Sequence, residues 1–273
     1  MKKKDPIASA LVRLEKKEKK LLSKKTEQNP PQLTRWLDGK LPDKLQSTVH
    51  RAFQTAFERI FTNGGTVIDK TVAAEKHRRA YEIHRYAAEI EPSKKNLRAF
   101  SQKARQIRRG NTAISAAAGM SMGFFGIGLP DIPVFVGILL KNIYETALVN
   151  GFDYRTPGEQ YFILLLIESA LSCGEEAGQR ETLVNAWIDA HRAIPAGTQT
   201  DAVFREQMAR TARALSGTAL YMKFIQGIPL IGAAGGISDA AAVSQIGTYA
   251  ALKYERRRLL SQKQDMTTGG TPS

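Results

Sequence analysis

Residues that carry out catalysis are scarce in this sequence, which has one cysteine and four histidines among 273 residues. Because Cys173 is alone, no intramolecular disulfide can form, and a reducing compartment fits best. No base stands near Cys173 in the sequence, and the apolar helix end around it predicts a packed thiol. Cysteine chemistry is therefore not expected.

Signals for export, strands and nucleotides are absent as well. The apolar stretch at residues 7–14 is too short for a signal peptide and is interrupted by Arg13, so we expect no export signal. Alternating polar and apolar runs, the mark of half-buried strands, are missing. The run GMSMGFFGIG has no Gly-Lys-Ser/Thr after it and no strand before it. It predicts neither a phosphate loop nor a dinucleotide site, and no cofactor is expected.

Acidic residues are too few in the N-terminal part to balance its lysines and arginines. Residues 1–110 hold 27 Lys/Arg and 12 Asp/Glu, whereas residues 111–273 hold 13 and 14, within a net charge of +14. This asymmetry favours an anionic partner, either membrane lipid or nucleic acid, although it also serves solubility. No helix-turn-helix, zinc-finger or RNA-binding signature is visible, so nucleic acid is not the expected partner.

The longest apolar segment runs from Gly110 to Leu140, with Asp131 as its one ionisable residue. About 20 apolar residues suffice to span a bilayer, but an aspartate near the middle costs about 2.5–3.5 kcal/mol on insertion scales. The glycines and two prolines of the segment would also break a single helix. We therefore expect a helical hairpin that turns near residues 126–133, either in the protein core or dipping into one leaflet.

Apolar residues recur at helical spacing along the chain, which predicts an all-α fold: a multi-helix bundle with two Gly-rich apolar helical hairpins. Capping residues, glycines and prolines set the expected helix ends. We expect helices at about residues 5–25, 42–62, 66–90, from 93 onward, 131–150, 157–173, 181–191, 201–225 and 238–258. The stretch YFILLLIESALSC is apolar almost all round and should be buried. Thr156 and Glu159 fit a capping box in which the glutamate reaches back to the threonine N–H.

The N-terminal segment of the sequence predicts a helix that contacts lipid. Asp5 caps it, Pro6 occupies its first turn, and apolar residues between Ile7 and Leu14 share one face. A basic amphipathic helix of this kind lies on anionic lipid, although a solvated lysine-rich tail has the same composition. The lysines expected at the lipid surface are Lys2, Lys3, Lys4, Lys16, Lys17, Lys19 and Lys20. The expected organisation is a basic extension and linker at residues 1–40, a helical domain at 41–258 and a disordered tail at 259–273.

A short repeat puts two aspartates in equivalent positions. Gly128-Leu129-Pro130-Asp131 matches Gly236-Ile237-Ser238-Asp239, and each follows a Gly-rich apolar stretch and opens a long helix. Both aspartates can act as N-caps that satisfy free backbone N–H groups. Alternatively, if the two Gly-rich hairpins pack closely, the two carboxylates form one polar centre.

His77 and His84 lie seven residues apart, each two residues after a glutamate. That spacing puts them on one face of a helix, but metal sites on helices more often space their ligands by three or four residues. A solvated polar face is the expectation here, and no metal site is predicted.

Two blocks of the sequence resemble the EcsC protein family. The first has a Gly-rich run, an Asp-Ile-Pro and a Gly-Phe-Asp turn, and the second is IPLIGAAGGISDAAAVSQIGTYA. The matching residues are Gly123, Gly126, Gly128, Asp131, Ile132, Pro133, Gly151, Phe152, Asp153 and Pro157 in the first block, with Gly235, Gly236 and Asp239 in the second. The resemblance covers about residues 45–258, and Pro130 stands where the family usually has alanine.

The resemblance implies an accessory factor of an ABC transporter system, peripheral at the inner face of the cytoplasmic membrane, with no defined reaction. Two alternatives stay open from the residues. One is a hydrolase-like helical enzyme that uses Asp131 and Asp239. The other is an interaction module with an exposed apolar patch at Phe124 and Phe125. The sequence defines no oligomeric state.

Overall fold

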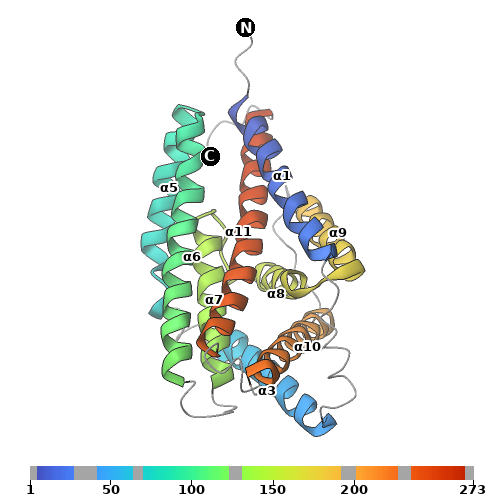
Figure 1. Ribbon diagram of the computed structural model, residues 1–273. Helices are drawn as coiled ribbons and strands as arrows, with labels where there is room; N and C mark the ends of the chain where they lie inside the picture. Colours follow the sequence, from blue (N-terminus) through green and yellow to red (C-terminus); the bar gives the residue numbers. More distant parts are fainter. Residues whose placement is uncertain are drawn as a thin grey trace.

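The computed structural model describes residues 5–27, 42–63, 70–122, 131–191, 201–226 and 235–267. Within these ranges the chain forms nine α-helices and no strand, which confirms the predicted all-α multi-helix fold (Figure 1). In chain order they are α1 (Pro6–Glu27), α3 (Asp43–Asn63), α5 (Ala74–Ile90), α6 (Lys94–Met122), α7 (Asp131–Leu148), α8 (Pro157–Leu171), α9 (Gly174–Ala190), α10 (Asp201–Gln226) and α11 (Gly235–Thr267). Residues 123–130 and 227–234, which hold most of the first predicted turn and of the second Gly-rich stretch, lie outside the described ranges.

Four helices, α5, α6, α7 and α11, run side by side along the length of the molecule (Figure 1). Helix α8 lies across the middle, in contact with α9, α10 and α11, while α3 and α10 pack together at one end. Helix α1 packs against α9 and α11. It begins at the end of the bundle where α5 gives way to α6 and where α11 finishes.

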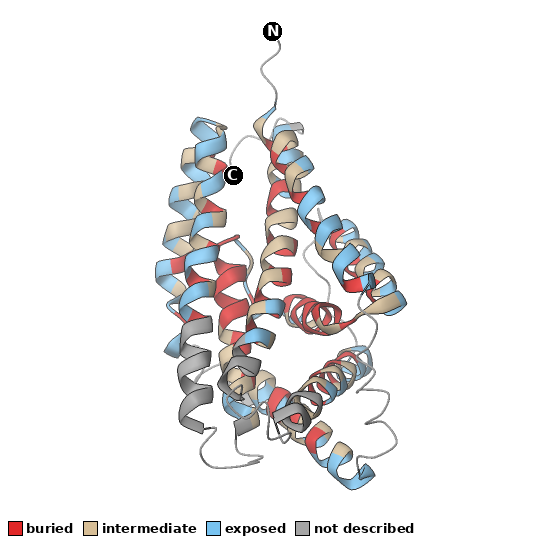
Figure 2. Cartoon of the chain, in the orientation of Figure 1, coloured by how far each residue is buried: buried red, intermediate tan, exposed pale blue. Residues whose placement is uncertain are grey.

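Helix α8 is the centre of the hydrophobic core, which confirms that its all-round apolar sequence is buried. Every residue from Phe162 to Ala170 is buried, and Figure 2 shows the helix almost wholly in the buried colour. Only a position enclosed by other helices satisfies a helix that is apolar on all sides. The ring of Phe162 stacks on that of Trp187 in α9, with centroids 4.2 Å apart.

Three predicted helix ends are confirmed by their caps. The Asp5 carboxylate accepts a hydrogen bond from the Ile7 N–H at 2.8 Å, and the Thr156 hydroxyl accepts one from the Glu159 N–H at 3.3 Å. After α7, Gly151 has a φ of 89°, which favours glycine. The Phe152 N–H then donates to the Ala147 carbonyl at 3.0 Å, closing the helix with a Schellman pattern.

Other ends differ from the predictions. The helix expected at residues 66–90 is interrupted: Lys70 and Thr71 are helical, the chain then makes a tight turn at the buried Val72, and α5 begins at Ala74. The helix expected at 181–191 begins seven residues earlier, at Gly174. The last helix begins at Gly235 rather than at Ser238, so Asp239 does not open it. It continues to Thr267, and Leu259, 1% exposed, belongs to a core rather than to a tail.

A second, smaller core closes the end of the bundle at which α5 turns into α6. We call it the terminal core, and its buried members are Ile7, Ala10 and Leu14 of α1, Ala88 of α5, Leu97 and Phe100 of α6, and Leu259 of α11. The apolar face of α1 therefore packs against protein rather than lipid. Among the described helices, none combines the length and the apolar composition that a bilayer crossing requires.

Candidate functional site

The Gly-Phe-Asp turn of the sequence motif joins α7 to α8 and docks on α5. A Cβ atom at Gly151 would lie 2.4 Å from the ring of Tyr81, so only glycine allows this approach. One residue past Phe152, the Asp153 carboxylate accepts a hydrogen bond from the Arg78 guanidinium at 3.1 Å. Gly151 and Asp153 thus hold the turn against α5, which gives this part of the motif a structural role.

The structure describes only some of the other motif residues. Gly126 and Gly128 lie outside the described residues, and so do the side chains of Asp131 and Asp239. Asp131 is the first residue of α7, and Pro133 is exposed in the first turn. Gly235 and Gly236 open α11. The pairing of the two aspartates in one polar centre stays a prediction.

Helix α7 carries a buried polar cluster that the sequence patterns did not reveal. Glu145 is 5% exposed, and its carboxylate accepts hydrogen bonds from Lys141 Nζ at 2.5 Å and from Asn111 Nδ2 at 2.8 Å. The Nε2 atom of His77 in α5 lies 3.6 Å from the same carboxylate. Burial alone would raise the pKa of Glu145, but these donors together lower it to about 2. Glu145 is thus an anion at neutral pH, fixed among three helices.

The prediction that His77 and His84 line a solvated face was wrong. His77 is 5% exposed and faces Glu145, while the half-buried His84 packs edge-on against Phe100, with ring centroids 5.4 Å apart. Spacing placed the two histidines on one face correctly, but that face turns inward because Ala88, on the same side, packs in the terminal core. Across the described residues, no group of three His, Cys, Asp or Glu side chains is placed to hold a metal ion.

A second buried cluster ties α1 to the body of the protein. Lys253 in α11 is 0% exposed. Its ammonium pairs with Glu18 of α1 at 3.0 Å and with Glu181 of α9. It also donates to the amide oxygen of Asn185 at 3.0 Å. The other oxygen of Glu18 accepts a hydrogen bond from Arg256 at 2.8 Å. Charges buried in this way are costly unless paired, and here each has a partner.

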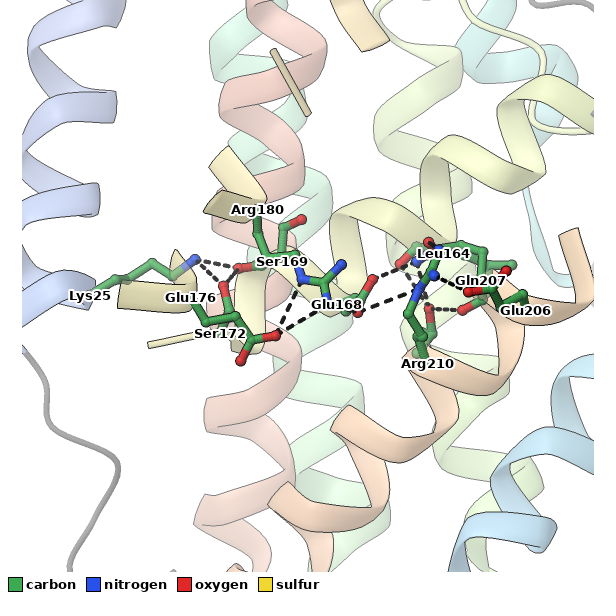
Figure 3. Close-up of polar contacts among 11 residues, drawn as sticks. Lys25, Leu164, Glu168, Ser169, Ser172, Glu176, Arg180, Glu206, Gln207 and Arg210 are labelled. Atoms are coloured by element: carbon green, nitrogen blue, oxygen red, sulfur yellow. Dashed lines mark hydrogen bonds and ion pairs between the residues drawn. The ribbon is translucent and has the colours of Figure 1, made fainter. Parts of the chain in front are cut away.

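Lys25, near the end of α1, extends this connection. It is 6% exposed, and burial lowers its pKa to about 8. Its ammonium donates to the Ser169 carbonyl of α8 (Figure 3). The same ammonium lies 4.8 Å from the centroid of the Tyr249 ring. A cavity of about 10 Å³ lies between Lys25, Lys253 and their neighbours, which is room for about one water molecule. It is far too small for a substrate.

A third buried carboxylate joins α8, α9 and α10. In Figure 3, Glu168 of α8 lies between Arg180 of α9, at 2.8 Å, and the amide of Gln207 of α10, which donates at 2.7 Å. The hydroxyl of Thr211 donates to the Leu164 carbonyl at 3.1 Å. These contacts cross-link three helices at the edge of the apolar core.

The fourth buried carboxylate belongs to Glu159, and it corrects the predicted capping box. Its oxygens accept hydrogen bonds from the Tyr254 hydroxyl at 2.6 Å and from both Nη atoms of Arg257, at 2.7 and 3.0 Å. The Thr156 N–H instead donates to the Asp153 carbonyl at 3.3 Å. The glutamate turns away because a bidentate, partly buried guanidinium is a stronger partner than a backbone N–H.

The surface offers a different feature from these interior clusters: a lysine-rich outer face on α1. Lys16, Lys17, Lys19 and Lys20 are all exposed there, as is Lys24. Two acidic residues of α1 are exposed as well: Glu15, which pairs with Lys19 at 3.0 Å, and Glu27 at the end of the helix. Lys2, Lys3 and Lys4, predicted for the same surface, lie outside the described residues.

The fold and the site together define a class of protein. It is an all-helical bundle whose buried carboxylates are ion-paired and whose helix α1 has a basic outer face. The chain belongs to the EcsC protein family, which it matches over residues 7–259, α1 included. It is 24% identical to Protein EcsC from Bacillus subtilis (strain 168) over 197 residues, which cover 69% of this chain and 78% of that protein. No solved structure matches the chain.

Proposed function

We propose that this protein is an accessory factor, linked to an ABC transporter system, that binds the inner face of the cytoplasmic membrane through anionic lipid. The observation that carries the proposal is the exposed lysine face of α1, with Lys16, Lys17, Lys19 and Lys20 on the outside. Because the apolar face of the same helix packs in the terminal core, α1 contributes charge rather than apolar insertion.

Electrostatics of this kind has a definite signature. Each lysine close to an anionic surface contributes about 1 kcal/mol, so four of them supply roughly 4 kcal/mol at low salt. The Debye length falls from about 10 Å at 0.1 M to about 3 Å at 1 M salt, which removes most of this attraction. Binding through α1 is therefore selective for anionic lipid and reversible by salt.

Vesicle co-sedimentation tests the proposal. The chain should sediment with vesicles that contain phosphatidylserine at low salt and be released at high salt, and it should bind neutral phosphatidylcholine vesicles weakly. Replacing the four lysines of α1 by glutamine should lower the affinity at least tenfold. A matched control removes the same charge from α3 and α10 by substituting the exposed Lys44, Arg51, Arg59 and Arg205. Equal binding to both kinds of vesicle would contradict the proposal.

The transporter link rests on family membership and has its own test. A tagged chain purified from native membranes with mild detergent should bring ABC transporter subunits with it, identified by mass spectrometry. The four-glutamine variant of α1 separates the two parts of the proposal. If it loses vesicle binding but keeps the subunits, the link is a direct protein contact.

No observation in the described ranges favours the hydrolase alternative. The four buried glutamates, at positions 18, 145, 159 and 168, are all ion-paired. The cavity beside Lys25 has room for about one water molecule. The apolar patch suggested at Phe124 and Phe125 lies outside the described residues.

A further inference from the structure

The outer face of α5 carries an apolar stripe with no protein covering it. Ile83, Tyr86 and Ile90 are 67%, 66% and 67% exposed, the highest values among the exposed large hydrophobic side chains of the described ranges. They follow helical spacing, so they share one face of α5. That face is opposite the side on which His77 and Ala88 are buried.

Cations flank this stripe along its length. Lys76 and Arg79 are exposed and continue the same face towards the start of α5. Lys94, Lys95 and Arg98, all exposed, begin α6 directly beyond Ile90. Two of the acidic side chains nearby, Glu82 and Glu89, are held by Arg85, at 3.0 and 2.9 Å. The exposed Glu75 and Glu91 stand at the two ends of α5.

The turn between α5 and α6 is firmly built, so the stripe is held in place rather than frayed. The Ser93 hydroxyl accepts a hydrogen bond from the Asn96 N–H at 3.2 Å and begins α6. The amide group of Asn96 donates to the Ala87 and Glu91 carbonyls, at 3.0 and 2.9 Å. Beneath the turn, side chains of both helices pack in the terminal core.

We propose that the α5–α6 hairpin is the element that enters the bilayer, with Ile83, Tyr86 and Ile90 in the interfacial region of anionic lipid. This inference rests on the proposed function and names its lipid-contacting surface. Aliphatic side chains beside a tyrosine suit the boundary between head groups and acyl chains, where aromatic residues with a polar group are enriched. The flanking lysines and arginines meet the head-group phosphates.

A bilayer explains this composition better than a second protein helix does. Interfaces with proteins deplete lysine relative to the rest of the surface, whereas basic residues beside apolar ones are typical of surfaces that bind anionic membranes. The hairpin also lies at the end of the bundle where α1 begins, so the insertion and the start of the lysine-rich helix share one end of the molecule (Figure 1).

The test is vesicle binding by the double variant Ile83→Ser with Ile90→Ser, on the full chain. Its matched control is Leu183→Ser with Val203→Ser, which removes two exposed aliphatic side chains from α9 and α10. Circular dichroism and thermal unfolding should match the wild type for both, because none of the four side chains is buried. The double variant should bind phosphatidylserine vesicles at least tenfold more weakly. This loss is measured at low salt, where the wild type is bound, and the control should bind like the wild type.

The outcomes separate this inference from the proposed function. If the wild type binds anionic vesicles with the expected salt dependence and the double variant binds equally well, the hairpin inference fails alone. If the wild type binds no vesicles, both fail. If the double variant keeps its vesicle affinity but no longer recovers a transporter subunit that the control recovers, the stripe is a protein interface and the inference is overturned.

Discussion

Helices α1 and α5 are built alike on the inside and differ on the outside. Each buries an apolar face in the terminal core and makes a buried polar contact with another helix, Glu18 with Lys253 for α1 and His77 with Glu145 for α5. On the outer side, α1 presents lysines, whereas α5 presents Ile83, Tyr86 and Ile90.

The difference shows what an amphipathic pattern establishes and what it does not. The apolar stripe of α1 suggested a helix that lies on lipid, yet protein covers that stripe. Helix α5 has apolar residues on two faces, and one of these faces stays exposed to solvent after the helix has packed. A membrane contact is therefore better sought in the apolar surface that remains exposed than in the most amphipathic segment.

The largest loss of stability is expected from a change in the buried cluster that attaches α1. Lys253→Met should lower the free energy of unfolding by about 3–5 kcal/mol, because it leaves the buried Glu18 and Glu181 close together without their shared cation. Urea unfolding followed by circular dichroism measures this. Lys24→Met is the control, since Lys24 is exposed, and it should change stability by less than about 0.5 kcal/mol. Similar effects for both would show that α1 is not an integral part of the fold.

The attachment of α5 predicts a smaller effect that depends on pH. The pKa of Glu145 is lowered from 4.5 to about 2 on folding, a shift that corresponds to at most about 3 kcal/mol. A carboxylate with a lowered pKa stabilises the fold above its unfolded pKa. The contribution is lost as the pH falls from about 4.5 towards 2.

Glu145→Gln should therefore destabilise the protein at pH 7 by about 2–3 kcal/mol, and the difference from the wild type should shrink across this acid window. Urea unfolding at a series of pH values measures it. Glu82→Gln is the control, because Glu82 is exposed, and it should show little of this dependence. A difference that stays constant between pH 7 and pH 3 would contradict the assignment.

Local patterns predicted much of the fold because they act within a few residues. The all-round apolar sequence of α8 required burial, and Asp5 and Gly151 marked helix ends through their backbone hydrogen bonds. The buried clusters could not be predicted in this way. Glu18 and Lys253 are 235 residues apart in the sequence, and only the packing of α1 against α11 brings them together.

The histidines and the hairpin illustrate the same limit. Spacing placed His77 and His84 on one face but did not say that this face meets Glu145, a residue on another helix. The spacing of Ile83, Tyr86 and Ile90 resembles that of a core face, and only their exposure in the fold distinguishes them. Side-chain partners and free surfaces are properties of the tertiary structure.

Fluorescence from labels on the two helices tests the central contrast most directly. An environment-sensitive dye is attached to a cysteine placed by Tyr86→Cys on α5 or by Lys17→Cys on α1. Both variants carry Cys173→Ser, since serine suits the helix N-cap that Cys173 occupies. On addition of phosphatidylserine vesicles, the emission of the dye at position 86 should shift strongly to the blue, while that at position 17 changes little. Equal shifts at both positions, or a shift at position 17 alone, would contradict the account.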